Sequence, residues 1–243
     1  DWALDVPAIL QIWYPGQELG HALAEVVFGD SGPGGRLPTT FPCRLEDTPA
    51  FTNYPGEGGQ VLYGEGLFVG YRWYDKRRIA PRFPFGHGLD YTEFSYANLS
   101  VNGPDPGSGA VTVGVEVTNV GQRPGTEVVQ LYLAPPAPSG ATPSGATPGS
   151  TPSGATPGST PGSTPLKELK AFAKVMLGPG ETQAVRLDLV GADFAQWSVE
   201  VEGWVIPPGP FEVMVGRSAD DIRLRGVVPY GASLVVDGGW TAR

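Results

Sequence analysis

The chain has 243 residues, with 16 Lys and Arg against 25 Asp and Glu, which gives a formal net charge of −9. This length suits one large or two ordinary domains, and the acidic balance argues against a nucleic-acid partner while it suits a neutral ligand such as a sugar. The single cysteine, Cys43, excludes an intramolecular disulfide, and we expect no membrane partner because no apolar run approaches the roughly 20 residues of a membrane span.

The first part of the chain carries the pattern of one winding of an α/β sheet. An apolar run at 8–13 ends at the turn signal Tyr14-Pro-Gly, and residues 17–28 then place apolar side chains at helical spacing. A short extended piece broken by prolines follows at 36–42. We therefore predict strand, helix and strand. Since one winding exposes an apolar face that nothing covers, we interpret it as the truncated end of a larger α/β domain.

The loop after the first predicted strand is the candidate ligand contact. In open α/β sheets, ligands bind beyond the carboxyl ends of the strands. That end carries Trp13 and Tyr14 here, and Glu18 follows at the start of the predicted helix. The alternative is structural, with two core or interface aromatic residues and an acid favoured by the helix dipole. Both interpretations stay open at this point.

The next region is dense in glycine and aromatic residues and has no long helical or alternating run, so we interpret it as a seam between two domains. Its acids Glu57, Glu65 and Asp75 are interpreted as solvated or salt-bridged groups, and the basic residues that follow Asp75 should keep it ionised. His87 lies between two glycines without an evident nucleophile and orienting group. We interpret its side chain as bonding the backbone at the junction.

Beyond the seam the hydrophobic period changes to two. Apolar residues alternate over 111–117, 129–133, 185–189 and 211–215, which predicts strands with one buried face. A phase change predicts a bulge near Ala97-Asn98. About seven such strands give the fold class as mainly β, a fibronectin-III-like antiparallel β-sandwich preceded by a truncated α/β segment.

Three regions result: the end of an α/β domain at 1–53, the seam at 54–93, and the sandwich at 94–229. An insertion at 135–165 repeats Ser-Gly-Ala-Thr-Pro and Gly-Ser-Thr-Pro units without charge, so it cannot bury a core and we expect it to be disordered. The sandwich needs strands from both sides of this insertion. The tail at 230–243 is unassigned.

Five motifs spread over most of the chain occur in a characteristic order. They are Tyr14-Pro-Gly-Gln-Glu18, Gly34-Gly-Arg-Leu-Pro38, Phe68-Val-Gly-Tyr-Arg-Trp-Tyr-Asp75, Phe83-Pro-Phe-Gly-His-Gly-Leu-Asp-Tyr-Thr92 and Glu127-Val-Val-Gln-Leu-Tyr132. Together they resemble glycoside hydrolase family 3, and most of all its β-glucosidase type. The order matches the end of that family's (α/β)6-sandwich domain and its fibronectin-III-like domain, over roughly residues 6–228.

The resemblance implies a retaining glycosidase whose Asp nucleophile and Glu acid/base both lie upstream of the matching motifs. Retention needs two carboxyl groups about 5 Å apart across the scissile bond. We therefore assign no catalytic residue, no metal and no cofactor to this chain. A β-glucoside or oligosaccharide substrate would bind through upstream domains. The rival interpretation is a non-catalytic carbohydrate-binding or adhesion module with a flexible stalk, and the sequence leaves oligomeric state and compartment open.

Overall fold

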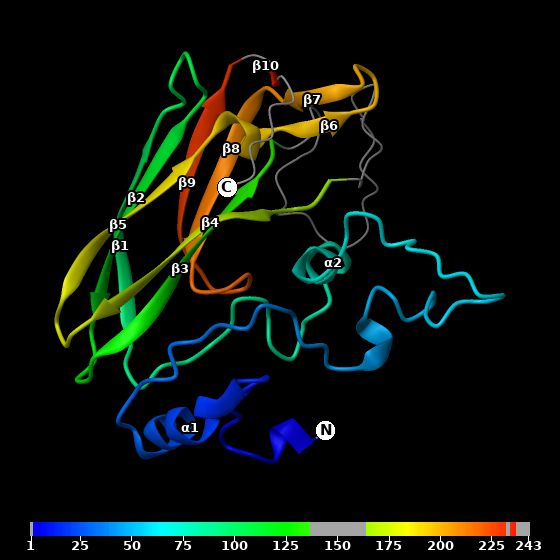
Figure 1. Ribbon diagram of the computed structural model, residues 1–243. Coiled ribbons are helices and arrows are strands. Elements are labelled where there is room, and N and C mark those ends of the chain that lie inside the picture. Colours follow the sequence, from blue (N-terminus) through cyan, green and yellow to red (C-terminus); the bar gives the residue numbers. More distant parts are fainter. Residues whose placement is uncertain (1, 137–163, 232–233, 237–243) are drawn as a thin grey trace, which may run out of the picture.

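The computed structural model describes residues 2–136, 164–231 and 234–236. An antiparallel β-sandwich forms the larger part, and the N-terminal residues with helix α1 lie at one end of it (Figure 1). The disorder predicted for the insertion concerns residues that fall almost entirely outside the described ranges. The same is true of most of the unassigned tail.

Two α-helices precede the sandwich in the described residues. α1 spans Leu19–Phe28 after a 3-10 turn, η2, at Gly16–Glu18, and α2 spans Tyr71–Arg77. α1 ends at Gly29, whose φ of 82° is the left-handed C-cap conformation that glycine adopts without a Cβ penalty. The predicted helix is confirmed in type and end. Further 3-10 turns are η1 (Trp2–Leu4), η3 (Leu45–Asp47) and η4 (Gly191–Phe194).

Seven strands of the described chain form two antiparallel sheets, as the period-two pattern predicts. The sheets have the orders β1-β2-β5 and β4-β3-β8-β9. The strands are β1 (Phe94–Asn102), β2 (Val111–Asn119), β3 (Gly125–Ala134), β4 (Glu168–Leu177), β5 (Thr182–Leu189), β8 (Gly209–Gly216) and β9 (Ile222–Tyr230). A smaller sheet, β10-β7-β6, contains β6 (Gln196–Ser198), β7 (Gly203–Ile206) and β10 (Leu234–Val236).

The core lies between the two large sheets. The four valines of β2 from Val111 to Val117 are at most 2% exposed, and they share one cluster with Val129, Leu131 and Leu133 of β3. The predicted bulge is confirmed, because the β1–β2 register shifts between Ala97 and Ser100. Alternating burial on β2 thus follows directly from the alternating sequence.

The predictions of strands near the N-terminus were wrong for the described structure. Residues 8–13 form no strand, and 36–42 contributes only one bridge, from Phe41 to Phe83. A strand is stabilised by pairing with a neighbour, and the described residues offer 8–13 no such neighbour. α1 has no buried residue either, and its Phe28 is 82% exposed. The apolar stripe of this helix is therefore uncovered.

Candidate functional site

The structure places all three predicted ligand-facing residues around the loop before α1, which we call the Trp13 loop (residues 13–18). Trp13 is 47% exposed and Tyr14 is 100% exposed, while Glu18 is an exposed residue at the N-cap of α1. The ring of Trp13 meets Phe41 edge to face, with centroids 6.1 Å apart and an interplanar angle of 80°. Trp13 is therefore packed on one side, whereas Tyr14 and Glu18 face solvent.

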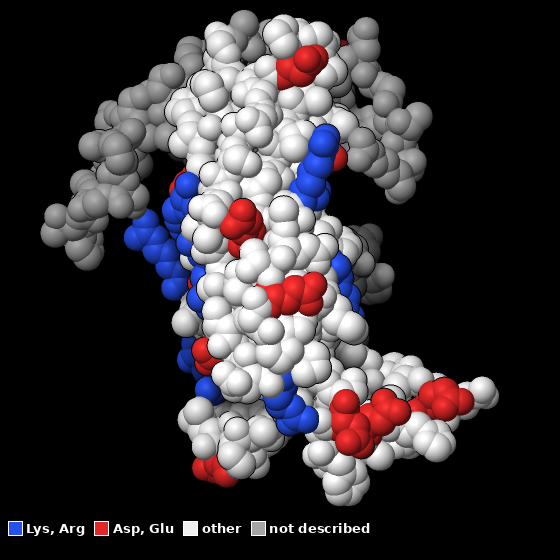
Figure 2. Space-filling model, turned by 90° about the vertical axis from the view of Figure 1, so that its left-hand side faces the viewer, with Lys and Arg blue, Asp and Glu red and all other residues white. Residues whose placement is uncertain are grey.

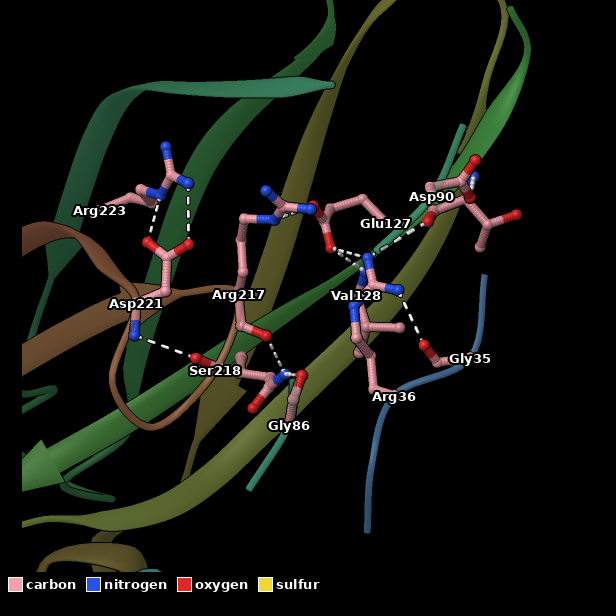
Figure 3. Close-up of polar contacts among 12 residues, drawn as sticks. Gly35, Arg36, Gly86, Asp90, Glu127, Val128, Arg217, Ser218, Asp221 and Arg223 are labelled. Carbon is pink, nitrogen blue, oxygen red and sulfur yellow. Dashed lines mark hydrogen bonds and ion pairs between the residues drawn. The ribbon is translucent and has the colours of Figure 1, made fainter. Parts of the chain in front are cut away.

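A buried ion cluster joins the segment after α1 to the sandwich (Figure 3). Arg36 Nη2 donates a hydrogen bond of 2.6 Å to Glu127 Oε1 on β3. Arg217, between β8 and β9, places its Nε 2.8 Å from Glu127 Oε2, an ion-pair distance without hydrogen-bond alignment. The Glu127 side chain is completely buried. A buried charge must be paired to be tolerated, so each of the two arginines stabilises the buried carboxylate of Glu127 from its own side.

The seam is also held by backbone hydrogen bonds beside this cluster. The Gly86 N–H donates to Leu37 O, and the Leu37 N–H donates to His87 O, both at 2.8 Å. Gln130 Nε2 of β3 donates to Gly86 O at 3.2 Å. Gly86 has a φ of 81°, and a Cβ there would lie 2.2 Å from Gln130 Oε1. A Cβ here would have to displace the buried, hydrogen-bonded amide of Gln130, so the position favours glycine.

Helix α2 is anchored to the start of β4. Lys167 Nζ lies 2.5 Å from Asp75 Oδ2, and the Leu169 N–H donates to Tyr71 Oη at 2.8 Å. The partner of Asp75 is thus Lys167, not the basic residues that follow it in sequence. Burial raises the pKa of the Asp75 carboxyl, and the hydrogen bond from Lys167 opposes that rise. The prediction that the basic residues next in sequence keep Asp75 ionised was therefore wrong, because the partner is Lys167.

His87 is half-buried against the ion cluster. Its ring stacks on Phe83, with centroids 5.3 Å apart at 24°. In the described residues, the His87 ring stacks on Phe83 instead of forming the predicted side-chain hydrogen bond to the backbone. It is the backbone carbonyl of His87 that accepts a hydrogen bond within the seam, from the Leu37 N–H. Burial lowers the pKa of His87, and the positive charges of Arg36 and Arg217 lower it further. The imidazole is therefore favoured in its neutral form.

Charged side chains outside the ion cluster and the α2 anchor lie on the surface and in the seam. On the face shown in Figure 2, basic and acidic side chains are mixed over the upper part, while several acidic side chains lie close together on the protruding part at the lower right. No three His, Cys, Asp or Glu side chains in the described ranges are grouped so as to hold a metal ion. Within the same ranges no helix has the length and apolarity to cross a membrane. Glu57 is exposed and Glu65 is half-buried.

Comparison with known proteins places these features in a family. Residues 1–91 match the family model of the glycosyl hydrolase family 3 C-terminal domain, and 155–219 match that of a fibronectin type III-like domain. The chain is 44% identical to a beta-glucosidase of Rhizobium radiobacter over 226 residues, which is 91% of this chain and 25% of that protein. The chain matches the C-terminal part of glycoside hydrolase family 3 proteins.

Further family 3 proteins align in the same way. Thermostable beta-glucosidase B of Acetivibrio thermocellus is 39% identical over 97% of this chain and 28% of its own length. The structure of beta-glucosidase 3B from Thermotoga neapolitana with glucose superposes with a TM-score of 0.80 at 36% identity, over 97% of this chain and 30% of that one. A Bifidobacterium adolescentis family 3 beta-glucosidase gives 0.81 at 36% identity, over 99% and 32%. The chain thus spans about a quarter to a third of the family 3 relatives it matches.

The ion cluster is not predicted from the sequence, although one signal for it is present there. Glu127 occupies the same strand phase as Val129, Leu131 and Leu133, which are all buried. An acid in a core phase requires a partner of opposite charge. The strand pattern alone therefore indicates that Glu127 is a buried acid with a charged partner. It does not identify the two arginines, because they come from loops far away in sequence.

Proposed function

We propose that this chain is the C-terminal part of a retaining β-glucosidase-like hydrolase and that its role there is structural support of the catalytic domains. The observation that carries this proposal is the share of each relative that this chain covers. Relatives named beta-glucosidase align with 91% and 97% of this chain, which accounts for only 25% and 28% of their own length. The substrate class proposed for the whole enzyme is a terminal β-linked glucoside.

The uncovered N-terminal segment supports the proposal. Every residue of α1 is at least partly exposed, and Val27 and Phe28 are 62% and 82% exposed. Apolar side chains gathered on one helix normally face a core. We propose that upstream sequence supplies that core, so that 1–53 is the end of the α/β domain, 54–93 the seam and 94–229 the supporting sandwich.

The Trp13 loop is the part of this chain that we place next to the sugar. An exposed tryptophan and a fully exposed tyrosine offer flat rings for the apolar face of a pyranose, and Glu18 offers an acceptor for a hydroxyl group. The loop also lies on the segment that the C-terminal domain model matches. We propose Trp13, Tyr14 and Glu18 as substrate-adjacent residues without a covalent role.

A chimera tests the proposed function. In it, this chain replaces the matching 226 residues of the Rhizobium radiobacter beta-glucosidase. We expect the chimera to hydrolyse an aryl β-glucoside and the isolated 243-residue chain to show no turnover. Turnover by the isolated chain would contradict a purely supporting role. A chimera that unfolds cooperatively yet is inactive, while the parent enzyme is active, would contradict the assignment to this kind of enzyme.

The carbohydrate-binding alternative is settled by titration of the isolated chain. Under the proposed function, glucose and β-linked oligosaccharides show no saturable binding to it, because the glycone site needs upstream residues. Saturable binding that Trp13→Ala leaves intact would favour a separate binding module. Isothermal calorimetry supplies this measurement directly.

A further inference from the structure

We propose that Phe41 is a positioning residue for the Trp13 loop. The rings of Trp13, Phe41, Phe83 and His87 form a continuous series of contacts, two edge to face and one stacked, which we call the stack for short. This series of contacts fixes the loop relative to the sandwich. The inference rests on the proposed function, in which the Trp13 loop lies next to the glycoside. It adds a specific route by which the fibronectin-like domain would influence sugar binding.

The stack begins at a residue whose backbone needs outside support. Trp13 has a φ of 51°, in the left-handed region that bulky residues rarely occupy. Such a conformation is strained and persists only where surrounding structure holds it. The aromatic contact of Trp13 is the edge-to-face packing on Phe41. This arrangement is the favourable one for two rings, and it covers only part of the tryptophan.

Phe41 is itself held on both backbone and side chain by Phe83. The Phe41 N–H donates to Phe83 O at 2.8 Å, and the Phe83 N–H donates back to Phe41 O at 3.3 Å. The two rings meet with centroids 6.3 Å apart at 67°. The Arg82 N–H adds a third hydrogen bond, to Phe41 O at 2.8 Å. Phe41 is therefore the fixed point from which Trp13 is supported.

The far end of the stack rests on the junction with the sandwich. Phe83 stacks on His87, whose carbonyl accepts the hydrogen bond from Leu37. Leu37 follows Arg36 directly, and Arg36 is locked in the buried cluster with Glu127. A contiguous packed path thus runs from β3 to the Trp13 loop. Contiguity by itself does not demonstrate coupling, which has to be measured by substitution.

The first experiment uses the 243-residue chain itself and needs no activity. The six tryptophans are replaced by 5-fluorotryptophan, and the Trp13 resonance is assigned in the ¹⁹F NMR spectrum with Trp13→Phe. Phe41→Leu should shift and broaden that resonance, whereas Phe41→Tyr, which keeps the ring, should restore it. An unchanged Trp13 resonance in Phe41→Leu would overturn the proposal.

A matched control separates positioning from general destabilisation. Phe194 packs against Phe211 and Tyr230, a cluster within the sandwich core that is separate from the stack. Phe194→Leu removes a fully buried ring, whereas Phe41 is half-buried, so Phe194→Leu should lower the melting temperature at least as much while leaving the Trp13 resonance in place. An equal shift of that resonance in Phe194→Leu would mean that the Phe41→Leu effect comes from general destabilisation of the fold. That result would overturn the proposal.

The second experiment measures kinetics in the chimera. Trp13→Ala and Phe41→Leu should both raise KM for an aryl β-glucoside by at least about fivefold with little change in kcat, because they weaken binding rather than chemistry. Phe41→Tyr should recover most of the loss, and Phe194→Leu should leave KM unchanged.

The two substitutions fail in distinguishable ways. No effect of Trp13→Ala would contradict the placement of the Trp13 loop beside the sugar, which belongs to the proposed function. An effect of Trp13→Ala without one of Phe41→Leu would contradict the positioning role alone. If the chimera is inactive, the proposed function fails, and the NMR comparison still decides whether Phe41 holds Trp13.

Discussion

Arg36 Nη2 and Glu127 Oε1 lie 2.6 Å apart, although 91 positions separate the two residues along the chain. Arg36 belongs to the segment that matches the C-terminal domain of family 3, and Glu127 belongs to β3 of the sandwich. Their side chains are 6% and 0% exposed. The two parts of the chain are therefore joined by a charge pair that neither part buries alone.

The first prediction concerns this pair. Glu127→Gln leaves Arg36 and Arg217 buried without a counter-charge, so it should lower the free energy of unfolding by about 3–5 kcal/mol. Glu212→Gln is the control, because its ion pair with Arg225 is exposed and should be worth less than about 1 kcal/mol. Urea denaturation of both variants gives the comparison. Equal losses in the two variants would show that the buried cluster does not hold the junction.

The second prediction concerns the close approach at Gly86. Gly86→Ala meets both a left-handed φ and Gln130 within 2.2 Å, and it should cost more than about 2 kcal/mol. Gly66→Ala has a similar φ of 57° but open space around it, so it should cost only about 1–2 kcal/mol. The difference between their unfolding free energies isolates the packing of the seam on β3. A Gly86 variant no less stable than the Gly66 variant would contradict that packing.

The third prediction concerns the anchor of α2. Lys167→Met leaves the half-buried Asp75 carboxylate without its partner, so the variant should be strongly destabilised at neutral pH. The folded-state pKa of Asp75 is already raised above its ordinary value of 3.8, and loss of Lys167 should raise it more. The folded state therefore holds its proton more tightly than the unfolded state, and the defect should shrink as pH falls through that folded pKa.

Melting temperatures at about pH 7 and about pH 4.5 test the Asp75 prediction. Arg186→Met is the control, since its ion pair with Asp188 is 72% and 50% exposed. The deficit of Lys167→Met relative to the parent should be smaller at the lower pH, while that of the control stays small at both. A deficit independent of pH would mean that the loss comes from packing rather than from the carboxylate.

The fourth prediction concerns His87, whose pKa is lowered in the folded state from an ordinary value of 6.5. The unfolded chain takes up a proton at this residue at a higher pH than the folded chain does. The stability that depends on neutral His87 is therefore complete above about pH 7 and falls as the pH drops through 6.5 toward the folded pKa. His87→Gln should remove this part of the acid sensitivity.

Thermal melts of His87→Gln between about pH 7.5 and 5.5 provide the measurement. His21→Gln, on the exposed surface of α1, is the control and should keep the parent's pH dependence. If His87→Gln loses as much stability on acidification as the parent, burial of a neutral imidazole against Arg36 and Arg217 is not the cause of the acid sensitivity.

Local sequence predicts much of the sandwich because β2, β3, β5 and β8 each carry an alternating pattern. The valines of β2 alternate in sequence and are buried in alternation, and the phase change before Leu99 marks the bulge that the register shows. The same reasoning fails for residues 8–13, because a strand depends on a partner and none is present in the described chain. An apolar run alone does not tell whether the strand that would pair with it is part of the described chain.

The sequence suggests the candidate residues by type, and their place next to a sugar stays a prediction, but it does not give their contacts. Trp13 and Tyr14 were expected at the end of a strand, and Glu18 at the start of a helix. Trp13, with its left-handed φ, and Tyr14 lie in an irregular segment, whereas Glu18 ends the turn η2 at the N-cap of α1. Nothing local in the sequence links Trp13 to Phe41, or Phe41 to Phe83, because those contacts depend on how the seam folds back. Side-chain pairing across loops is a tertiary property that periodicity does not encode.

We propose that the N-terminal residues form the end of an α/β layer that upstream sequence completes. Hydrogen–deuterium exchange of the α1 amides, in the isolated chain and in the chimera, tests it most directly. We expect rapid exchange of Leu19–Phe28 in the isolated chain, where no side chain of the helix is buried, and strong protection in the chimera. The β2 amides, whose side chains are buried already, should be equally protected in both. Strong and equal protection of α1 in both proteins would contradict the claim.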